Sequence, residues 1–230
     1  YVSVSMLNNF FECPWKWYFR NLLQLPEPEN ENLIFGSAVH EAVDQIIKAN
    51  KIVLPEDKEV AKVAKSWAER RLAEITPNRE TEYSISFADK NFPHLKIYGR
   101  IDLLEKLPDG TVRVTDFKTG SARRKSEIEK LDDDGRMGGN LRQLAMYSYL
   151  LSKNPSWRAE VRESRLEFVE VPNSFYDTVI SPERVKLLEK DIEDYDQLVK
   201  TGEWLSRPCN YNSYGKNTEC EYCKLAEIYK

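Results

Sequence analysis

The chain has 230 residues, of which 41% are hydrophobic and 31% are charged, and its formal net charge at pH 7 is −4. A chain of this length can bury a substantial core as one large domain. No apolar run approaches the roughly 18 residues that a membrane-spanning helix needs. The acidic balance does not indicate a nucleic-acid binder, although a site that carries carboxylates for metal ions would itself lower the total.

The chain begins with Tyr1 rather than Met and shows no signal peptide. We therefore expect a piece of a longer cytoplasmic protein with no membrane partner.

Residues 1–80 predict a mainly helical lobe. Ser3 or Ser5 can cap a first helix, whose apolar side chains recur at near-helical spacing, and Pro14 should kink or restart it. Further helices are expected from about residue 35 and over 60–75. The aromatic and basic residues at 15–20 suit stacking on the bases of a single strand. Aromatics at helical spacing more often fill a core, and we favour that interpretation here.

Residues 81–180 predict a sheet core. Strands are expected over 82–87, 95–104, 111–118 and 164–171, and a helix over 141–151. The charged, glycine-rich stretch 119–140 predicts a mobile loop. Residues 181–230 predict one long helix over 182–200 and an irregular tail that carries cysteines. The expected fold class is therefore mixed α/β, a single domain over 1–230 with a helix-flanked mixed sheet and an N-terminal helical extension.

A tight turn sets the register of the two central strands. Pro108 and Gly110 occupy the second and fourth positions that a type I turn favours. If the flanking residue 107 pairs with residue 111, Asp102 lies directly opposite Asp116. Lys118 lies two residues further along and points the same way.

These three charged side chains predict a divalent-metal site. Asp102 and Asp116 offer the hard oxygen ligands that Mg²⁺ and Mn²⁺ prefer. Such an ion activates water and neutralises charge on a phosphate oxygen, and Lys118 could steady the attacking water or the transition state. Solvated charges on an exposed strand face are the alternative.

Two further segments could join this site. His40 follows Gly36, which permits close approach, near the start of a predicted helix. Gln143 and Tyr147 are four residues apart and share one helix face, where they could hold a phosphate or orient the lysine. The structural alternatives are a surface or core histidine and a tyrosine packed in the core.

The order of these segments resembles the RecB-type branch of the PD-(D/E)XK nucleases. The matching motifs are Gly-x-x-x-His over 36–40, Gly-Arg-Ile-Asp over 99–102, Asp-Phe-Lys over 116–118 and Gln-x-x-x-Tyr over 143–147. The opening residues 5–14 are also similar to the start of that family. Residues 116–120 and 141–147 look closest to the nuclease domains at the C-terminus of UvrD-like superfamily 1 helicases.

The resemblance implies a restriction-endonuclease-like fold and a prokaryotic or phage deoxyribonuclease, an exonuclease by class, dependent on Mg²⁺ or Mn²⁺. The resemblance also implies a role in recombination or repair, with a helicase in the same or an associated chain. His40, Asp102, Asp116 and the Phe117 carbonyl would hold the metal. The remaining implied roles are catalysis by Lys118 with Gln143 and Tyr147 and a looser match of Glu82 to a family acidic residue. Contact with single-stranded DNA or duplex ends is expected from the basic stretch Arg123, Arg124 and Lys125, which lies beside the proposed metal site and can meet phosphates, and from Gln143 and Tyr147 on the following helix. The loop 119–140 is expected to order on DNA.

Two other functions fit the same motifs. One is a stand-alone CRISPR-adaptation nuclease that carries an iron–sulfur cluster. The other is a catalytically silent DNA-binding module of the same fold, against which the retained motif residues argue.

The four cysteines are Cys13, Cys209, Cys220 and Cys223. Relatives such as AddB and the CRISPR-adaptation nucleases bind a [4Fe–4S] cluster through one early and three late cysteines, but their late cysteines are differently spaced. Zinc also accepts four thiolates, and reduced cysteines without metal are the third interpretation. A disulfide framework does not suit a large chain without a secretory signal.

Overall fold

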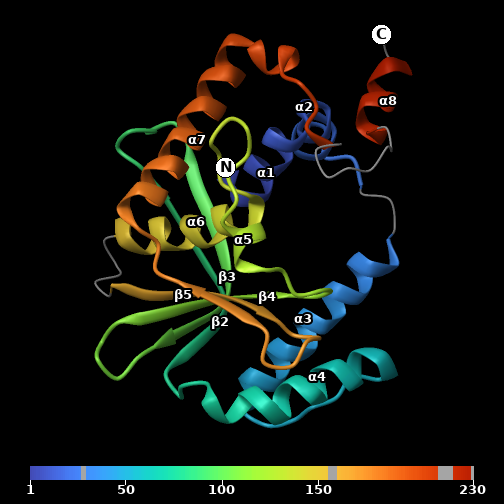
Figure 1. Ribbon diagram of the computed structural model, residues 1–230, viewed down its shortest axis with the longest axis vertical. Coiled ribbons are helices and arrows are strands. Elements are labelled where there is room, and N and C mark those ends of the chain that lie inside the picture. Colours follow the sequence, from blue (N-terminus) through green and yellow to red (C-terminus); the bar gives the residue numbers. More distant parts are fainter. Residues whose placement is uncertain (27–29, 155–159, 212–219, 229–230) are drawn as a thin grey trace.

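The computed structural model describes residues 1–26, 30–154, 160–211 and 220–228. Its centre is a mixed six-stranded sheet with helices on both faces, as the sequence predicted (Figure 1). The strands are β1 (Val2–Ser3), β2 (Arg79–Ala88), β3 (Lys96–Lys106), β4 (Val112–Lys118), β5 (Val161–Phe168) and β6 (Phe175–Thr178). They lie in the order β1-β3-β4-β5-β6, and β2 also pairs with β3.

The helices cover both faces of this sheet. They are α1 (Val4–Glu12), α2 (Pro14–Trp17), the π-helix η1 (Tyr18–Leu22), α3 (Glu31–Ala49), α4 (Lys58–Arg71), α5 (Lys125–Ile128), α6 (Gly139–Lys153), α7 (Pro182–Thr201) and α8 (Glu221–Ile228), with short 3-10 turns η2 (Leu72–Glu74) and η3 (Glu203–Ser206). None of the helices in the described part of the chain combines the length and apolarity needed to cross a membrane.

Two apolar clusters pack on opposite faces of the sheet. Helices α1, α6 and α7 cover one face together with Ile101, Leu104 and Val114 of the central strands. Helices α3 and α4 cover the other, where Leu103 and Phe117 join them. Figure 1 shows α3 and α4 on one side of the sheet and α6 and α7 on the other. Any side chain that leaves the sheet near residues 101–103 or 116–117 therefore points toward one of two different helix layers.

The N-terminal helices follow the predicted caps and break. The Ser3 hydroxyl accepts a hydrogen bond from the Met6 amide at 3.3 Å and caps α1, and Pro14 starts α2 after the extended residue Cys13. Trp17 is buried, and the rings of Trp15 and Trp17 both contact Trp204. The aromatics of this region fill a core, as the favoured interpretation stated.

Part of the predicted loop 119–140 is structured, so the prediction of an irregular loop was wrong from residue 125 onward. Residues 125–128 form α5, and Leu131 bridges to Met137. Ile128 and Met137 are buried, and Arg136 binds Asp191 of α7 at 2.8 Å. The buried residues Ile128 and Met137 are spaced too irregularly to predict a helix or strand. They nevertheless hold the segment in place, because they pack against residues far away in the sequence.

The sequence analysis also missed β1, β6 and α8. β1 has two residues and β6 has four, too few to establish an alternating pattern. α8 follows the undescribed residues 212–219 in what the sequence predicted as irregular tail. Its partner is α2 at the other end of the chain, so its packing is a long-range effect.

The central hairpin has the predicted register. The Leu107 amide donates to the Thr111 carbonyl at 2.8 Å, and the Gly110 amide donates to the Leu107 carbonyl at 3.0 Å. Gly110 adopts a left-handed φ of 83°, which glycine accepts without strain. Antiparallel pairing then extends to Leu103 opposite Thr115. Pairing stops there, so the predicted pair of Asp102 directly opposite Asp116 does not form. Beyond this point β4 continues in parallel register with β5, and β3 stays with β2.

Candidate catalytic site

The candidate site lies where β3 and β4 diverge. Asp102 and Asp116 are the first residues beyond the last β3–β4 pair, one on each strand. In place of a strand-to-strand bond, the Phe117 amide donates to Asp102 Oδ2 at 2.8 Å. Figure 1 shows β3 and β4 separating near the centre of the sheet. The fork thus presents two carboxylates and leaves room between the strands for other groups.

β2 and β3 are irregular at the same level. Their register runs unbroken except at Glu82 opposite Asp102, and Glu82 has a left-handed φ of 51°. Ile101 and Leu103 lie in different cores, although residues two apart share a face in a regular strand. A bulge-like distortion of this kind redirects side chains and is common next to active sites. Here it turns β3 at Asp102.

Helix α3 brings His40 to the fork. A Cβ atom on Gly36 would lie 2.9 Å from Thr119 Oγ1, so glycine allows α3 to approach the end of β4 closely. One turn later, His40 Nδ1 lies 3.5 Å from Asp102 Oδ2, and its ring meets Phe117 edge-on. The motif glycine and the motif histidine therefore act together, the first by close packing and the second by position.

Helix α6 brings Gln143 and Tyr147 to Asp116. The Gln143 Nε2 atom lies 2.5 Å from Asp116 Oδ1, the Tyr147 hydroxyl donates to the same oxygen at 3.1 Å, and Lys118 Nζ lies 2.7 Å from Asp116 Oδ2. Lys118 also donates to Gln143 Oε1 at 2.8 Å. A Cβ atom on Gly99 would lie 2.6 Å from Leu150 Cδ1, so this glycine lets α6 pack onto β3.

Burial sets the electrostatics of the site. Burial and the neighbouring charge of Asp116 raise the pKa of Asp102 well above its ordinary value. Burial lowers the pKa of His40, which favours the neutral imidazole that can bind a metal, and raises the pKa of Tyr147, whose hydroxyl stays a donor. A cation would relieve the repulsion between the two carboxylates.

The donor set fits a hard divalent ion. It comprises two carboxylates, an imidazole and the Phe117 carbonyl, and Asp116 Oδ2 is a buried oxygen with no well-directed hydrogen bond despite the nearby Lys118. The donor atoms of His40, Asp102 and Asp116 do not all lie within 4.8 Å of one another. Lys118, Gln143 and Tyr147 contact the Asp116 carboxylate. Binding one ion by all three residues would therefore require their donor atoms to come closer together.

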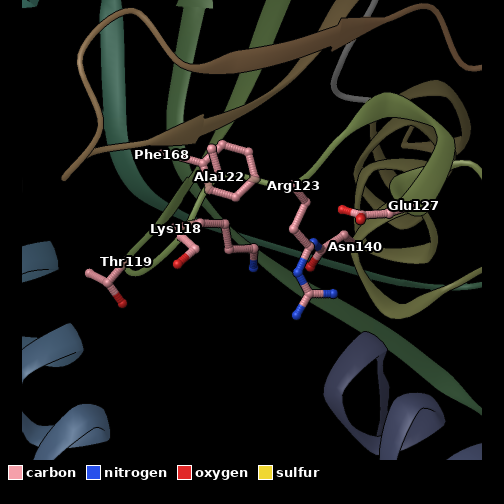
Figure 2. Close-up of a pocket in the computed structure, with 8 residues that line it drawn as sticks. Lys118, Thr119, Ala122, Arg123, Glu127, Asn140 and Phe168 are labelled. Carbon is pink, nitrogen blue, oxygen red and sulfur yellow. The ribbon is translucent and has the colours of Figure 1, made fainter. Parts of the chain in front are cut away.

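Among the other predicted site residues, Arg123 lies nearest the site. Glu82 pairs with Arg100 at 2.8 Å. Arg123 lines a pocket that it shares with Lys118, whereas Arg124 occupies the N-cap position of α5, where its amide donates to Glu127, and Lys125 begins that helix. The pocket also contains Asn140 and Phe168, which the sequence analysis missed (Figure 2). No short motif contains both, because they come from α6 and β5.

The four cysteines meet although they come from opposite ends of the chain. In the described part of the chain they are the one group of three or more potential metal ligands whose donor atoms all lie within 4.8 Å of one another. Cys13 Sγ lies 3.7 Å from the Sγ atoms of both Cys220 and Cys223. Burial raises the pKa of Cys13 and raises that of Cys223 to about 12, so without a cation these two thiols keep their protons.

Comparison with known proteins identifies the family. The model of the PD-(D/E)XK nuclease superfamily matches residues 1–228, and the chain belongs to that superfamily. A crystal structure of a "putative exonuclease" from Eubacterium rectale aligns with a TM-score of 0.59 at 16% identity, over 100% of this chain and 88% of that one, which shows a shared fold. The crystal structure of SSO0001 aligns with a TM-score of 0.32 at 17% identity, over 78% and 84% of the two chains, and supports no argument. No curated protein matches.

Proposed function

We propose that this domain is a metal-dependent deoxyribonuclease that hydrolyses phosphodiester bonds at the fork between β3 and β4. The observation that carries the proposal is the meeting of three separate segments, β3, β4 and α6, at Asp116, which contacts Lys118, Gln143 and Tyr147 and lies across the fork from Asp102. Membership of the PD-(D/E)XK nuclease superfamily supports the same reaction class.

Each side chain has a defined task in this proposal. His40, Asp102, Asp116 and the Phe117 carbonyl would hold Mg²⁺ or Mn²⁺, which supplies Lewis-acid activation of water and charge neutralisation at phosphate. Lys118 holds its ammonium where negative charge develops on the phosphoryl oxygens. Gln143 fixes that ammonium by accepting from Nζ at 2.8 Å, and Tyr147 orients Gln143 and Asp116.

The direct test is hydrolysis of end-labelled single- and double-stranded DNA with Mg²⁺ or Mn²⁺. We expect the wild type to cleave and Asp116→Asn to lose at least about a hundredfold in rate, because the substitution removes a charged ligand and the partner of Lys118. Asp133→Asn is the matched control, since Asp133 is exposed and lies outside the site. Absence of cleavage by the wild type, or full activity of Asp116→Asn, would overturn the proposal.

We further propose an exonuclease that acts in recombination or repair on single-stranded DNA or duplex ends, with a helicase in the same or an associated chain. Family membership and the retained motif residues support this assignment. The polarity of the end-labelled products tests it. DNA binding without hydrolysis would instead indicate a silent module, and a colourless protein after purification without oxygen would speak against the CRISPR-adaptation alternative.

We also propose that the four cysteines hold a metal centre. The resemblance implies a [4Fe–4S] cluster, in which each thiolate binds a different iron. Zinc bound by four thiolates at about 2.3 Å gives a tetrahedron with edges of about 3.8 Å, close to the two Sγ–Sγ separations of 3.7 Å. These two separations match a single zinc ion, whereas a cluster requires the thiolates to spread beyond 4.8 Å.

A further inference from the structure

A polar pocket of about 380 Å³ lies beside the candidate catalytic site. Lys118 belongs to both: it forms one wall of the pocket and also contacts Asp116 and Gln143. Figure 2 shows the side chains of Lys118 and Arg123 extending into the same space, with Asn140 beside them. Two cationic groups that face one cavity favour an anionic occupant.

We propose that this pocket binds a phosphate group of the DNA strand adjacent to the phosphate that is cleaved, with Arg123 as its main ligand. The inference rests on the proposed nuclease function, since Lys118 defines where the cleaved phosphate lies. The catalytic motifs contact the cleaved phosphate, and the pocket would contact the neighbouring phosphate.

The bonding state of Arg123 supports this assignment. Partly buried arginines elsewhere bind carboxylates, as Arg136 and Arg142 do with Asp191. Arg123 makes no hydrogen bond or ion pair with any residue in the described ranges, and its side chain is exposed. All the donors of its guanidinium are available, and their planar arrangement suits two oxygens of one phosphate.

Helix α6 adds to the positive potential of the pocket. Its N-cap is Gly138, which provides no side-chain hydrogen bond, and Asn140 in its first turn lines the pocket. The uncapped amides of a helix N-terminus attract anions, and the Asn140 side chain adds an amide donor. Glu127 is the carboxylate among the lining residues, and its Oε2 accepts the Arg124 amide at 3.0 Å.

The remaining wall suits a nucleotide. Phe168 is buried in β5 opposite Lys118 and presents its ring to the cavity (Figure 2). Pockets that bind small ligands usually have volumes of about 300–1,000 Å³. The volume here accommodates a phosphate with its sugar, and the ring gives the sugar or base an apolar contact.

The test compares Arg123→Gln with Lys62→Gln, an exposed lysine of α4 on the other face of the sheet. Binding of a fluorescent single-stranded oligonucleotide is measured by anisotropy, without divalent ions, at several salt concentrations. We expect Arg123→Gln to weaken binding several-fold. It should also make the slope of log K against log[salt] shallower by about 0.7, the value for one lost single-strand phosphate contact. Lys62→Gln should match the wild type.

A second measurement locates the phosphate. Oligonucleotides with one neutral methylphosphonate at successive linkages, and with or without a terminal phosphate, are bound to both proteins. The wild type should be weakened by neutralising one linkage, and Arg123→Gln should not respond to that same change. A response to the terminal phosphate alone would assign the pocket to a strand end rather than an internal diester.

The proposal is overturned if the wild type does not bind, if the salt slope of Arg123→Gln equals that of the wild type, or if both proteins respond alike to every neutral linkage. None of these measurements requires catalysis. An Arg123-dependent slope in a protein that does not hydrolyse DNA would therefore reject the nuclease proposal and retain the phosphate pocket.

Discussion

Tyr147 shows how a single buried hydroxyl can organise charged groups. Its side chain is almost entirely buried, its ring faces Gly99 of β3, and its hydroxyl reaches both Gln143 and Asp116. A polar atom at such depth requires a partner, because an unsatisfied hydroxyl is costly to bury. Two partners are available here, and both also contact Lys118.

Tyr147→Phe should therefore separate stability from activity. We expect a loss of about 1–2 kcal/mol in the free energy of unfolding, because a hydrogen bond to a carboxylate disappears. The rate of DNA hydrolysis should fall several-fold, because Gln143 and Asp116 lose a common support. Urea unfolding and initial rates with Mg²⁺ measure the two effects.

Tyr176→Phe is the matched control, because the Tyr176 hydroxyl donates to Glu129 at 2.7 Å, away from the site. It should lower stability similarly and leave the rate unchanged. An unchanged rate in Tyr147→Phe would show that Tyr147 acts only in packing.

At the scale of elements, two glycines determine how closely helices approach the fork. Gly36 lets α3 meet Thr119, and Gly99 lets α6 meet β3. At both positions a Cβ atom would force the facing side chain, Thr119 or Leu150, to move. The two helices then present His40 and Gln143 to opposite sides of the diverging strands, so helix packing and site geometry are coupled.

Gly99→Ala tests this coupling. The added methyl group would lie 2.6 Å from Leu150 Cδ1 in a filled core, and overpacking of this kind costs about 1–3 kcal/mol. The same change should displace α6 and lower the rate of hydrolysis. Thermal unfolding and the cleavage assay measure both.

Leu150→Ala supplies the control as a double-mutant cycle. Alone it should destabilise by about 2–5 kcal/mol through its cavity. Combined with Gly99→Ala, the total loss should be smaller than the sum, because the cavity accepts the methyl group. If the two losses of stability simply add, the contact between residue 99 and Leu150 is not the reason why Gly99→Ala destabilises the protein.

At the scale of the whole molecule, the cysteine group joins the two ends of the chain. Cys13 lies between α1 and α2, and Cys220 and Cys223 lie at the start of α8, which packs beside α2. Cys209 completes the group from the segment after η3. A metal bound here would stabilise the folded state, because the unfolded chain cannot assemble the four ligands.

Metal analysis after anaerobic purification tests this centre. Iron with visible absorbance indicates a cluster, and zinc in a colourless protein indicates a single ion. A protein that contains no iron and no zinc would contradict the proposed centre. Cys220→Ser should lose the metal and lower the melting temperature by several degrees, because one ligand is missing. A substitution that only perturbs packing would lower the melting temperature without removing the metal, so the metal content and the melting curve together distinguish the two cases.

Part of the site was predictable because the hairpin that carries it is local. The turn at Pro108 and Gly110 fixes the register as far as Leu103 opposite Thr115, so Asp102 and Asp116 follow the last pair on the two strands, although the distortion at Asp102 was not predictable from alternation. Likewise, the α1 cap and the break at Pro14 depend on residues next to them. The motif order over 36–147 indicated the family that the comparison identified.

What the sequence by itself determined is therefore the hairpin, the main helices and the identity of the candidate catalytic residues, since each depends on neighbours in the chain. Tertiary structure alone decided the divergence of β3 from β4, the approach of α3 and α6, the pocket around Arg123 and the assembly of the four cysteines. These features join segments far apart in sequence. Their positions follow from how two apolar cores pack against one sheet, which no local pattern specifies.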